Sequence, residues 1–125
     1  MNKLLLTLGL FFMISAVALS QTQVLSGTWC ANSETRNYTL DKNSGERKVT
    51  IEVNFLKPFE NKPDVVLGVS ALDADKNNNI RYSVNPKSIS RDGFIVEITT
   101  WSETKIFTIC GFWMAHSNPM MGSEE

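Results

Sequence analysis

Apolar and polar residues alternate almost without a break from Pro58 to Ala115, and a shorter alternation runs from Arg47 to Phe55. A period of two places successive side chains on opposite faces of a β-strand, so it predicts strands with one buried face. Strands are expected at 21–30, 47–55, 64–72, 80–85, 94–101 and 104–115, separated by turn residues. The pattern favours an all-β fold, a six-stranded antiparallel β-sandwich. A barrel is the alternative that periodicity does not separate from it.

Two of these segments are apolar on both faces, namely 64–72 and 104–115. Such strands are expected to be buried on both sides or to lie at a subunit contact. In the last strand, Ile106, Cys110, Phe112 and Met114 are expected on one face, with Phe107, Ile109 and Trp113 on the other. Val66 and Trp113 are expected to face outward. A single sandwich would expose these apolar side chains to water, so a trimer is expected.

The first twenty residues have the composition of a signal peptide. Asn2-Lys3 supplies a short positive region, Leu4–Val17 an apolar run, and Ala18–Ser20 small residues, so cleavage is expected before Gln21. A membrane anchor is the alternative, but the run falls short of the roughly 20 apolar residues that span a bilayer. The expected organisation is a signal peptide at 1–20, one domain at 21–115 and a flexible tail at 116–125, in a secreted protein without membrane insertion.

Removal of Lys3 with the signal peptide leaves 11 of the 12 basic residues against 13 acidic ones. This balance argues against nucleic acid as a partner, because nucleic-acid binding requires clustered positive charge. Cys30 and Cys110 remain, and in an oxidising compartment a distant pair usually forms a structural disulfide. A bridge to another chain and free thiols are the alternatives. Two cysteines alone offer too few ligands for a metal site.

Several shorter motifs carry weaker signals. Asn37-Tyr38-Thr39 is a glycosylation sequon. Residues 73–79 alternate oxygen ligands as a calcium loop does, but Asn78 and Val84 stand where an EF-hand requires Gly and Glu, so a turn is expected. His116 lies outside the expected domain, which leaves no Ser-His or Cys-His pair for catalysis. No cofactor or metal is expected.

Arg81 and Trp101 both fall on the polar side of their strands. Sugar recognition requires an aromatic face against the C–H side of a pyranose and fixed donors for its hydroxyls, and these two residue types supply them. From spacing alone, a solvated arginine and a tryptophan at the core edge are the simpler interpretation.

The order and separation of several segments resemble the H-type lectins, a family of N-acetylgalactosamine-binding agglutinins that includes discoidin C-terminal domains. The resemblance extends from Val49 to Ala115. It is carried by Phe55-Leu56-Lys57-Pro58-Phe59, Pro63-Asp64-Val65-Val66-Leu67, Leu72-Asp73, Asn79-Ile80-Arg81-Tyr82, Gly93-Phe94, Thr100-Trp101-Ser102-Glu103-Thr104-Lys105 and Phe112-Trp113-Met114-Ala115.

The resemblance implies a non-enzymatic, multivalent lectin that assembles as a trimer or hexamer and binds galactose or N-acetylgalactosamine in agglutination, adhesion or defence. It assigns sugar hydroxyls to Arg81 and the sugar ring to Trp101. Ser102 stands where the family often has histidine, which puts the preference for N-acetyl sugars in doubt. The family's loop aspartate is assigned to Asp41, although a gapless alignment places Ser44 there.

Two other functions remain open. The first is a structural or adhesive sandwich protein with a degenerate sugar site. The second is a small hydrolase that uses a carboxylate pair such as Asp73 and Asp75.

Overall fold

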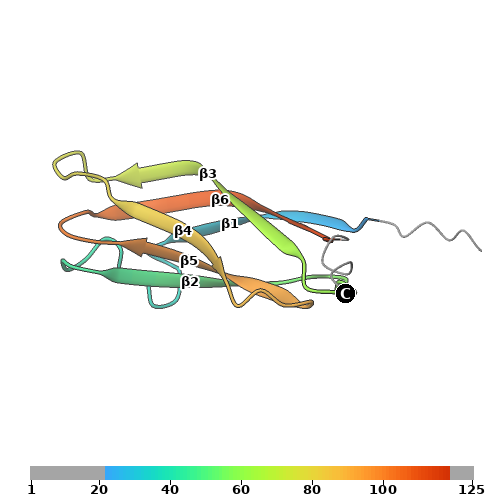
Figure 1. Cartoon of the computed structure of the whole chain (residues 1–125). Coiled ribbons are helices and arrows are strands. Elements are labelled where there is room, and N and C mark those ends of the chain that lie inside the picture. The colour runs from blue at the N-terminus through green and yellow to red at the C-terminus, as the bar shows by residue number, and fades with distance from the viewer. Residues whose placement is uncertain (1–21, 119–125) are drawn as a thin grey trace, which may run out of the picture.

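The computed structural model describes residues 22–118, which form two antiparallel three-stranded sheets packed face to face (Figure 1). The strands are β1 (Val24–Asn32), β2 (Arg47–Asn54), β3 (Asp64–Ala74), β4 (Tyr82–Lys87), β5 (Gly93–Thr100) and β6 (Ile106–His116). One sheet has the order β1-β6-β3 and the other the order β2-β5-β4. The predicted six-stranded sandwich is therefore confirmed, and two separate sheets exclude the barrel.

The two expected domain limits, before residue 21 and after residue 115, lie close to the ends of the described segment. The expected signal peptide and its cleavage before Gln21 lie outside the described residues. The expected tail begins inside the sandwich, because β6 extends to His116 and the Ser117 amide donates to the Gln23 carbonyl at 2.9 Å. No helix within residues 22–118 is long and apolar enough to cross a membrane.

The core lies between the inner faces of the two sheets. The β2–β5 register pairs Val49 with Ile98 and Val53 with Phe94, so apolar side chains of both strands share one face. Burial alternates along β5 as the sequence predicts, with its even-numbered residues inside. The residues that the sequence pattern assigns to the apolar face of these two strands are therefore the residues that face the core.

Four aromatic rings fill the core at the end where β2 finishes and β5 begins. The ring centroids of Phe55 and Phe59 are 5.1 Å apart, and those of Phe94 and Trp113 are 5.5 Å apart, both in edge-to-face arrangements. Phe55 also lies 5.8 Å from Trp113. Such offset ring pairs stabilise a core beyond the area that they bury.

Two glycines give large rings of the neighbouring strand a place to lie. Gly27 pairs with Trp113, and a Cβ there would come within 2.6 Å of the indole nitrogen. On the outer face, a Cβ on Gly68 would come within 2.1 Å of the Phe112 ring. Any side chain at either position would displace an aromatic ring.

The expected faces of 104–115 are partly wrong. Ile106 and Trp113, which were assigned to opposite faces, are both buried in the core, and Phe107 is exposed. Trp113 is therefore not outward-facing. The β3–β6 register shifts between Asp73 and Ala74, where one extra residue of β6 reverses which face its side chains occupy. A pattern of strict period two cannot register such a bulge, because residues on either side of it follow opposite phases.

A second register shift lies in β3, between Val69 and Ala71. Burial of both faces, one of the two expectations for this strand, is not observed in the single chain. Val65 and Leu67 pack against the core, whereas Val66 is exposed. The outer face of the β1-β6-β3 sheet, called the apolar face below, carries exposed hydrophobic side chains. These are Val66, Phe107, Phe112 and Met114.

The fourth strand begins two residues later than expected. Ile80 precedes β4 and is exposed, Tyr82 is also exposed, and only Val84 packs against the core. The strand continues through Pro86 to Lys87, past the expected end at residue 85. This is possible because β4 is an edge strand, where one side of the backbone needs no donor.

Cys30 and Cys110 form a disulfide within the chain, directly across the β1–β6 ladder. The interchain bridge and the free thiols are thereby excluded for this structure. The bond joins positions 80 residues apart and lies at strands that the ladder already pairs.

We expect replacement of both cysteines by serine to lower the free energy of unfolding by up to about 4–5 kcal/mol, because the unfolded chain regains the entropy of a long loop. Chemical denaturation of the wild type and of the double variant measures the difference. The single substitution Ser26→Ala, on the same exposed side of β1, serves as the control. Equal denaturation midpoints of wild type and double variant would contradict the expectation.

Candidate functional site

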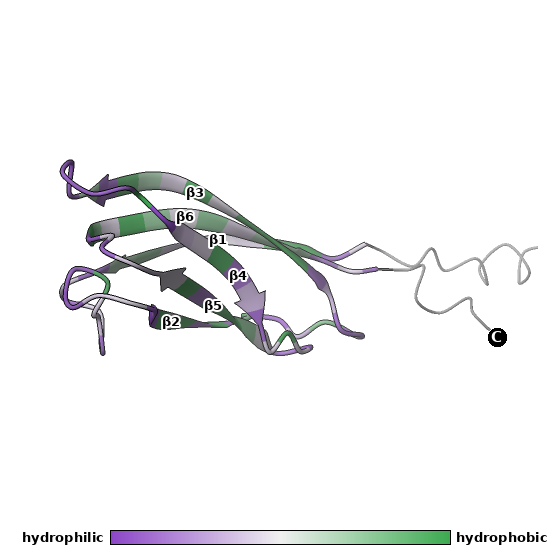
Figure 2. Ribbon diagram, turned by 60° about the vertical axis from the view of Figure 1, so that its left-hand side comes forward, coloured by the Kyte–Doolittle hydropathy of each residue, from purple (hydrophilic) through white to green (hydrophobic). Residues whose placement is uncertain are grey.

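Three loops meet at one end of the sandwich, which we call the loop end (Figure 1). They connect β1 to β2 (33–46), β3 to β4 (75–81) and β5 to β6 (101–105). In Figure 2 the loops at the left of the view are coloured as hydrophilic, whereas much of β3 and β6 is hydrophobic. Arg81, Trp101, Ser102 and Asp41, the four residues assigned from the sequence, all belong to these loops.

Arg81 and Trp101 leave the β4–β5 ladder at the same point. The ladder ends with the pair Tyr82 and Thr100, and Arg81 and Trp101 are the next residues on the two strands. The Thr100 hydroxyl donates to the Arg81 carbonyl at 2.6 Å, and the Arg81 amide donates to the Thr104 hydroxyl at 3.1 Å. The backbone of Arg81 is thus fixed from both sides, which leaves its side chain free of structural bonds to the main chain.

The Arg81 guanidinium is incompletely satisfied. Its Nη1 is buried and has no hydrogen-bond partner, and its only ion pair within residues 22–118 is with Glu103, 3.6 Å from Nη1 to Oε2. The side chain remains 34% exposed. Nearby, Trp101 is 40% exposed, an unusual position for an indole in a small domain. An unused donor and an exposed ring at adjacent strand ends are the elements that a polar ligand with an apolar face requires.

Ser102 occupies a backbone conformation that favours glycine, with φ of 57°. Its carbonyl turns inward and accepts bonds from the Gly45 amide and from Arg47 Nη2, both at 3.0 Å. The residue itself remains exposed. Ser102 therefore connects two of the three loops through its main chain.

Asp41 is partly buried, and its Oδ1 is buried without a hydrogen-bond partner. Burial, and secondarily the negative charge of Asp41, raises the pKa of Tyr38 to about 12. The Tyr38 hydroxyl donates to the Ile106 carbonyl at 2.5 Å and so holds the same loop against β6. Ser44, the alternative from a gapless alignment, is exposed. A buried carboxylate oxygen without a hydrogen-bond partner is uncommon in a folded protein.

Arg47 is the residue that organises the loop end, a role that its place at the start of a predicted strand did not indicate. It is only 7% exposed, and it donates to the carbonyls of Leu40 (3.4 Å), Lys42 (2.8 Å), Gly45 (3.0 Å) and Ser102 (3.0 Å). Among the described residues it makes no ion pair. Its charge is therefore balanced by backbone dipoles of two loops, which it holds together.

A signal for Arg47 is present in the sequence. Arg47 has the same parity as Val49 and Ile51, the inward-facing residues of β2. A charged residue at an inward position requires several hydrogen-bond acceptors, because an uncompensated buried charge is very costly. The same reasoning applies to Thr100, an inward residue of β5 that is fully buried.

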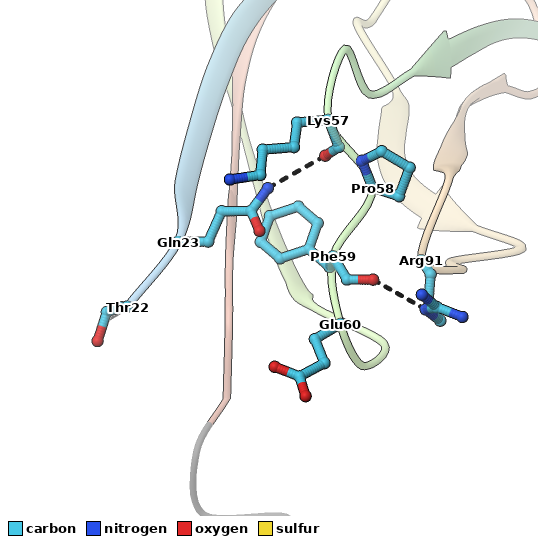
Figure 3. A pocket seen from close by; sticks show the side chains of 7 residues that line it. All are labelled: Thr22, Gln23, Lys57, Pro58, Phe59, Glu60 and Arg91. Atoms are coloured by element: carbon cyan, nitrogen blue, oxygen red, sulfur yellow. Dashed lines mark hydrogen bonds between the residues drawn. The ribbon is translucent and has the colours of Figure 1, made fainter. Parts of the chain in front are cut away.

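A pocket with a volume of about 510 Å³ lies at the opposite end of the sandwich. Figure 3 shows Phe59 in its middle, Lys57 and Gln23 on one side and Arg91 on the other. The Arg91 Nε donates to the Phe59 carbonyl at 2.8 Å and Gln23 to the Lys57 carbonyl at 3.1 Å, which fixes the loop after β2. None of the residues assigned from the sequence lines this pocket.

The remaining motifs take ordinary positions. Asp75 accepts a bond from the Asn77 amide at 2.9 Å, a local turn, although β3 continues to Ala74 and the turn is shorter than the expected 73–79. No group of three or more potential metal ligands occurs among residues 22–118. Asn37 is exposed in the β1–β2 loop, and its glycosylation stays a prediction. His116 lies at the far end of β6, away from the loop end.

Comparison with known proteins identifies the class of this domain. Residues 50–116, more than half of the chain, match the H-type lectin domain, and the chain belongs to that family of carbohydrate-binding domains. The resemblance noted from the sequence is therefore confirmed.

Individual relatives share parts of the chain. One of the discoidin-1 polypeptides of Dictyostelium discoideum is 32% identical over 80 residues, 63% of this chain and 32% of the relative. A protein of Fuscovulum blasticum described as ATP synthase subunits region ORF 7 is 32% identical over 72 residues, 58% of this chain and 63% of the relative. The chain thus spans less than two thirds of the length of each of these relatives.

The solved structure of discoidin II from Dictyostelium discoideum has the same fold. It superimposes with a TM-score of 0.69 at 23% identity, over 78% of this chain and 38% of that chain. At this identity the likeness concerns the fold.

We expect Arg47→Ala to lower the free energy of unfolding by roughly 2–4 kcal/mol, because several buried carbonyls lose a charged donor at once. Hydrogen exchange should accelerate at the Gly45 amide, which depends on the same loop arrangement. The matched control is Lys48→Ala, the next residue on the exposed face, whose effect should stay below about 0.5 kcal/mol. Similar values for the two variants would contradict the organising role of Arg47.

Proposed function

We propose that the loop end binds a sugar of the galactose or N-acetylgalactosamine type, and that the protein acts as a secreted, multivalent lectin rather than as an enzyme. The observation that carries the proposal is the arrangement at the end of the β4–β5 ladder. There, an exposed indole and an arginine with an unused donor follow the same terminal pair. Family membership supplies the ligand class.

Arg81 suits sugar hydroxyls because its planar fork presents several donors in a fixed direction. The two threonine hydroxyls fix the backbone of Arg81 and thus the point from which its side chain extends. Trp101 complements it with a flat face for the C–H side of the ring.

Ser102 and Asp41 are proposed to complete the site. A serine hydroxyl donates and accepts, but it is shorter than the histidine common in the family, so plain galactose should compete well with N-acetylgalactosamine. Asp41 offers the unpaired Oδ1 as acceptor for a sugar hydroxyl. Hydrogen bonds to a charged acceptor are about twice as strong as neutral ones, which makes this oxygen valuable to a ligand.

The apolar face supports assembly into a homotrimer or a hexamer. Phe112 is 50% exposed at the centre of its sheet, because β6 lies between β1 and β3. A contiguous apolar surface of this kind usually marks a protein interface. Assembly would join several weak sugar sites, and linked sites raise avidity without new contacts.

Export from the cell is also part of the proposal. The disulfide between Cys30 and Cys110 is typical of proteins that mature in an oxidising compartment, and the signal-peptide pattern of residues 1–20 agrees with it.

We expect Arg81→Ala and Trp101→Ala each to reduce binding to immobilised galactose at least about fivefold, with thermal unfolding nearly unchanged. Loss of a charged donor or of a stacking ring costs about 1–3 kcal/mol. Surface plasmon resonance and thermal scans measure both properties. Arg91→Ala removes an equivalent guanidinium at the opposite end and should bind like the wild type. Undiminished binding by both loop-end variants would contradict the proposed site, and galactose binding by neither variant nor wild type would favour a structural role.

We expect the wild type to be a trimer at micromolar concentration and Phe112→Asp to be a monomer, since a buried, unpaired carboxylate would be costly at the interface. Light scattering measures the mass. Thr50→Asp, which places the same charge on the exposed face of the other sheet, should leave the trimer intact. A monomeric wild type, or dissociation by both variants alike, would argue against the apolar face as the interface.

A further inference from the structure

We propose that Glu103 makes the site select against anionic sugars. The inference rests on the proposed sugar-binding function of Arg81 and Trp101, and it assigns to Glu103 a role in specificity rather than in holding the fold.

Glu103 lies in the β5–β6 loop, two residues after Trp101. Its Oε2 is 3.6 Å from Arg81 Nη1, too far for a hydrogen bond, so the two groups attract each other only through their charges. The Glu103 side chain is 70% exposed. A side chain this exposed, with a screened ion pair, contributes little to the stability of the fold.

The main chain nevertheless holds Glu103 beside Arg81. The neighbouring Thr104 is buried, and its hydroxyl accepts from the Arg81 amide at 3.1 Å and donates to the Asn79 carbonyl at 2.5 Å. On the other side, the Ser102 carbonyl is bonded to Arg47. The carboxylate is therefore positioned next to the guanidinium by loop contacts on both sides.

An unaccompanied arginine would prefer carboxylates and sulfates to hydroxyls, because charge-assisted bidentate pairs are its strongest contacts. A second negative charge bound at Arg81 would lie within about 6 Å of Glu103 and be repelled. A neutral hydroxyl meets no such repulsion. Nη1 makes no hydrogen bond within the domain, so a neutral ligand can use this donor without breaking an internal bond.

The test uses three probes that differ in charge: methyl galactopyranoside, methyl galactopyranosiduronate and the protonated amino sugar methyl galactosaminide. The wild type should bind the anionic sugar more weakly than the neutral one. In Glu103→Gln, the affinity for the uronate relative to the neutral sugar should rise about three- to tenfold, the range for like charges at this separation near a protein surface. The relative affinity for the amino sugar should fall.

Salt provides a readout that a purely structural role would not change. The difference between wild type and Glu103→Gln should shrink as ionic strength rises from about 0.01 M to 0.15 M, because the Debye length falls from about 30 Å to about 8 Å. Thermal unfolding of the two proteins should agree.

Two variants control for charge and position. Glu46→Gln changes the net charge equally at the same end, but the Glu46 carboxylate pairs with Lys48 at 3.4 Å instead of with Arg81, so the selectivity should not change. Glu103→Asp keeps the charge and should keep the discrimination. The proposal is overturned if Glu103→Gln has the same relative affinities as the wild type, or if Glu46→Gln shifts them as much. A wild type that binds none of the three sugars would refute the sugar site itself, a result distinct from unselective binding.

Discussion

A single buried guanidinium determines how the loop end of this domain is built. Arg47 donates to four backbone carbonyls, three from the β1–β2 loop and one from the β5–β6 loop. Loops lie at the surface because their backbone groups need partners, and these two loops find shared partners in one side chain. The positions of Asp41 and Ser102 therefore depend on a residue that no ligand is expected to touch.

The two ends of the sandwich are closed by different forces. At one end Phe55, Phe59, Phe94 and Trp113 pack as a ring cluster, where shape and apolar area decide the arrangement. At the loop end, hydrogen bonds from Arg47, Tyr38, Thr100 and Thr104 take their place. Directed bonds specify orientation more strictly than apolar contacts do, which suits the end that has to present donors and acceptors at set positions.

The sequence predicts best those features that depend on local alternation. The buried faces of β2 and β5 follow their period of two, and the placement of Arg81 and Trp101 at adjacent strand ends follows from the resulting pairing. The assignment of Trp113 is wrong because the bulge in β6 is set by pairing with β3, a contact distant in sequence. The role of Arg47 was missed for a similar reason. Its acceptors come from loops whose conformation periodicity does not describe, although its inward parity was readable.

Arg47 and Arg81 are the same residue type, but they make different hydrogen bonds and therefore serve different purposes. The hydrogen bonds of the Arg47 guanidinium go to main-chain carbonyls, so the residue is inert toward a ligand. Arg81 is held through its own amide and carbonyl instead, which leaves its guanidinium with one loose ion pair. An arginine is thus available for recognition when its backbone, and not its side chain, makes the hydrogen bonds that hold it in the fold. An inward position demands side-chain bonds, so the parity of Arg47 in β2 already commits its guanidinium to the fold, whereas Arg81 precedes β4 and has no such demand.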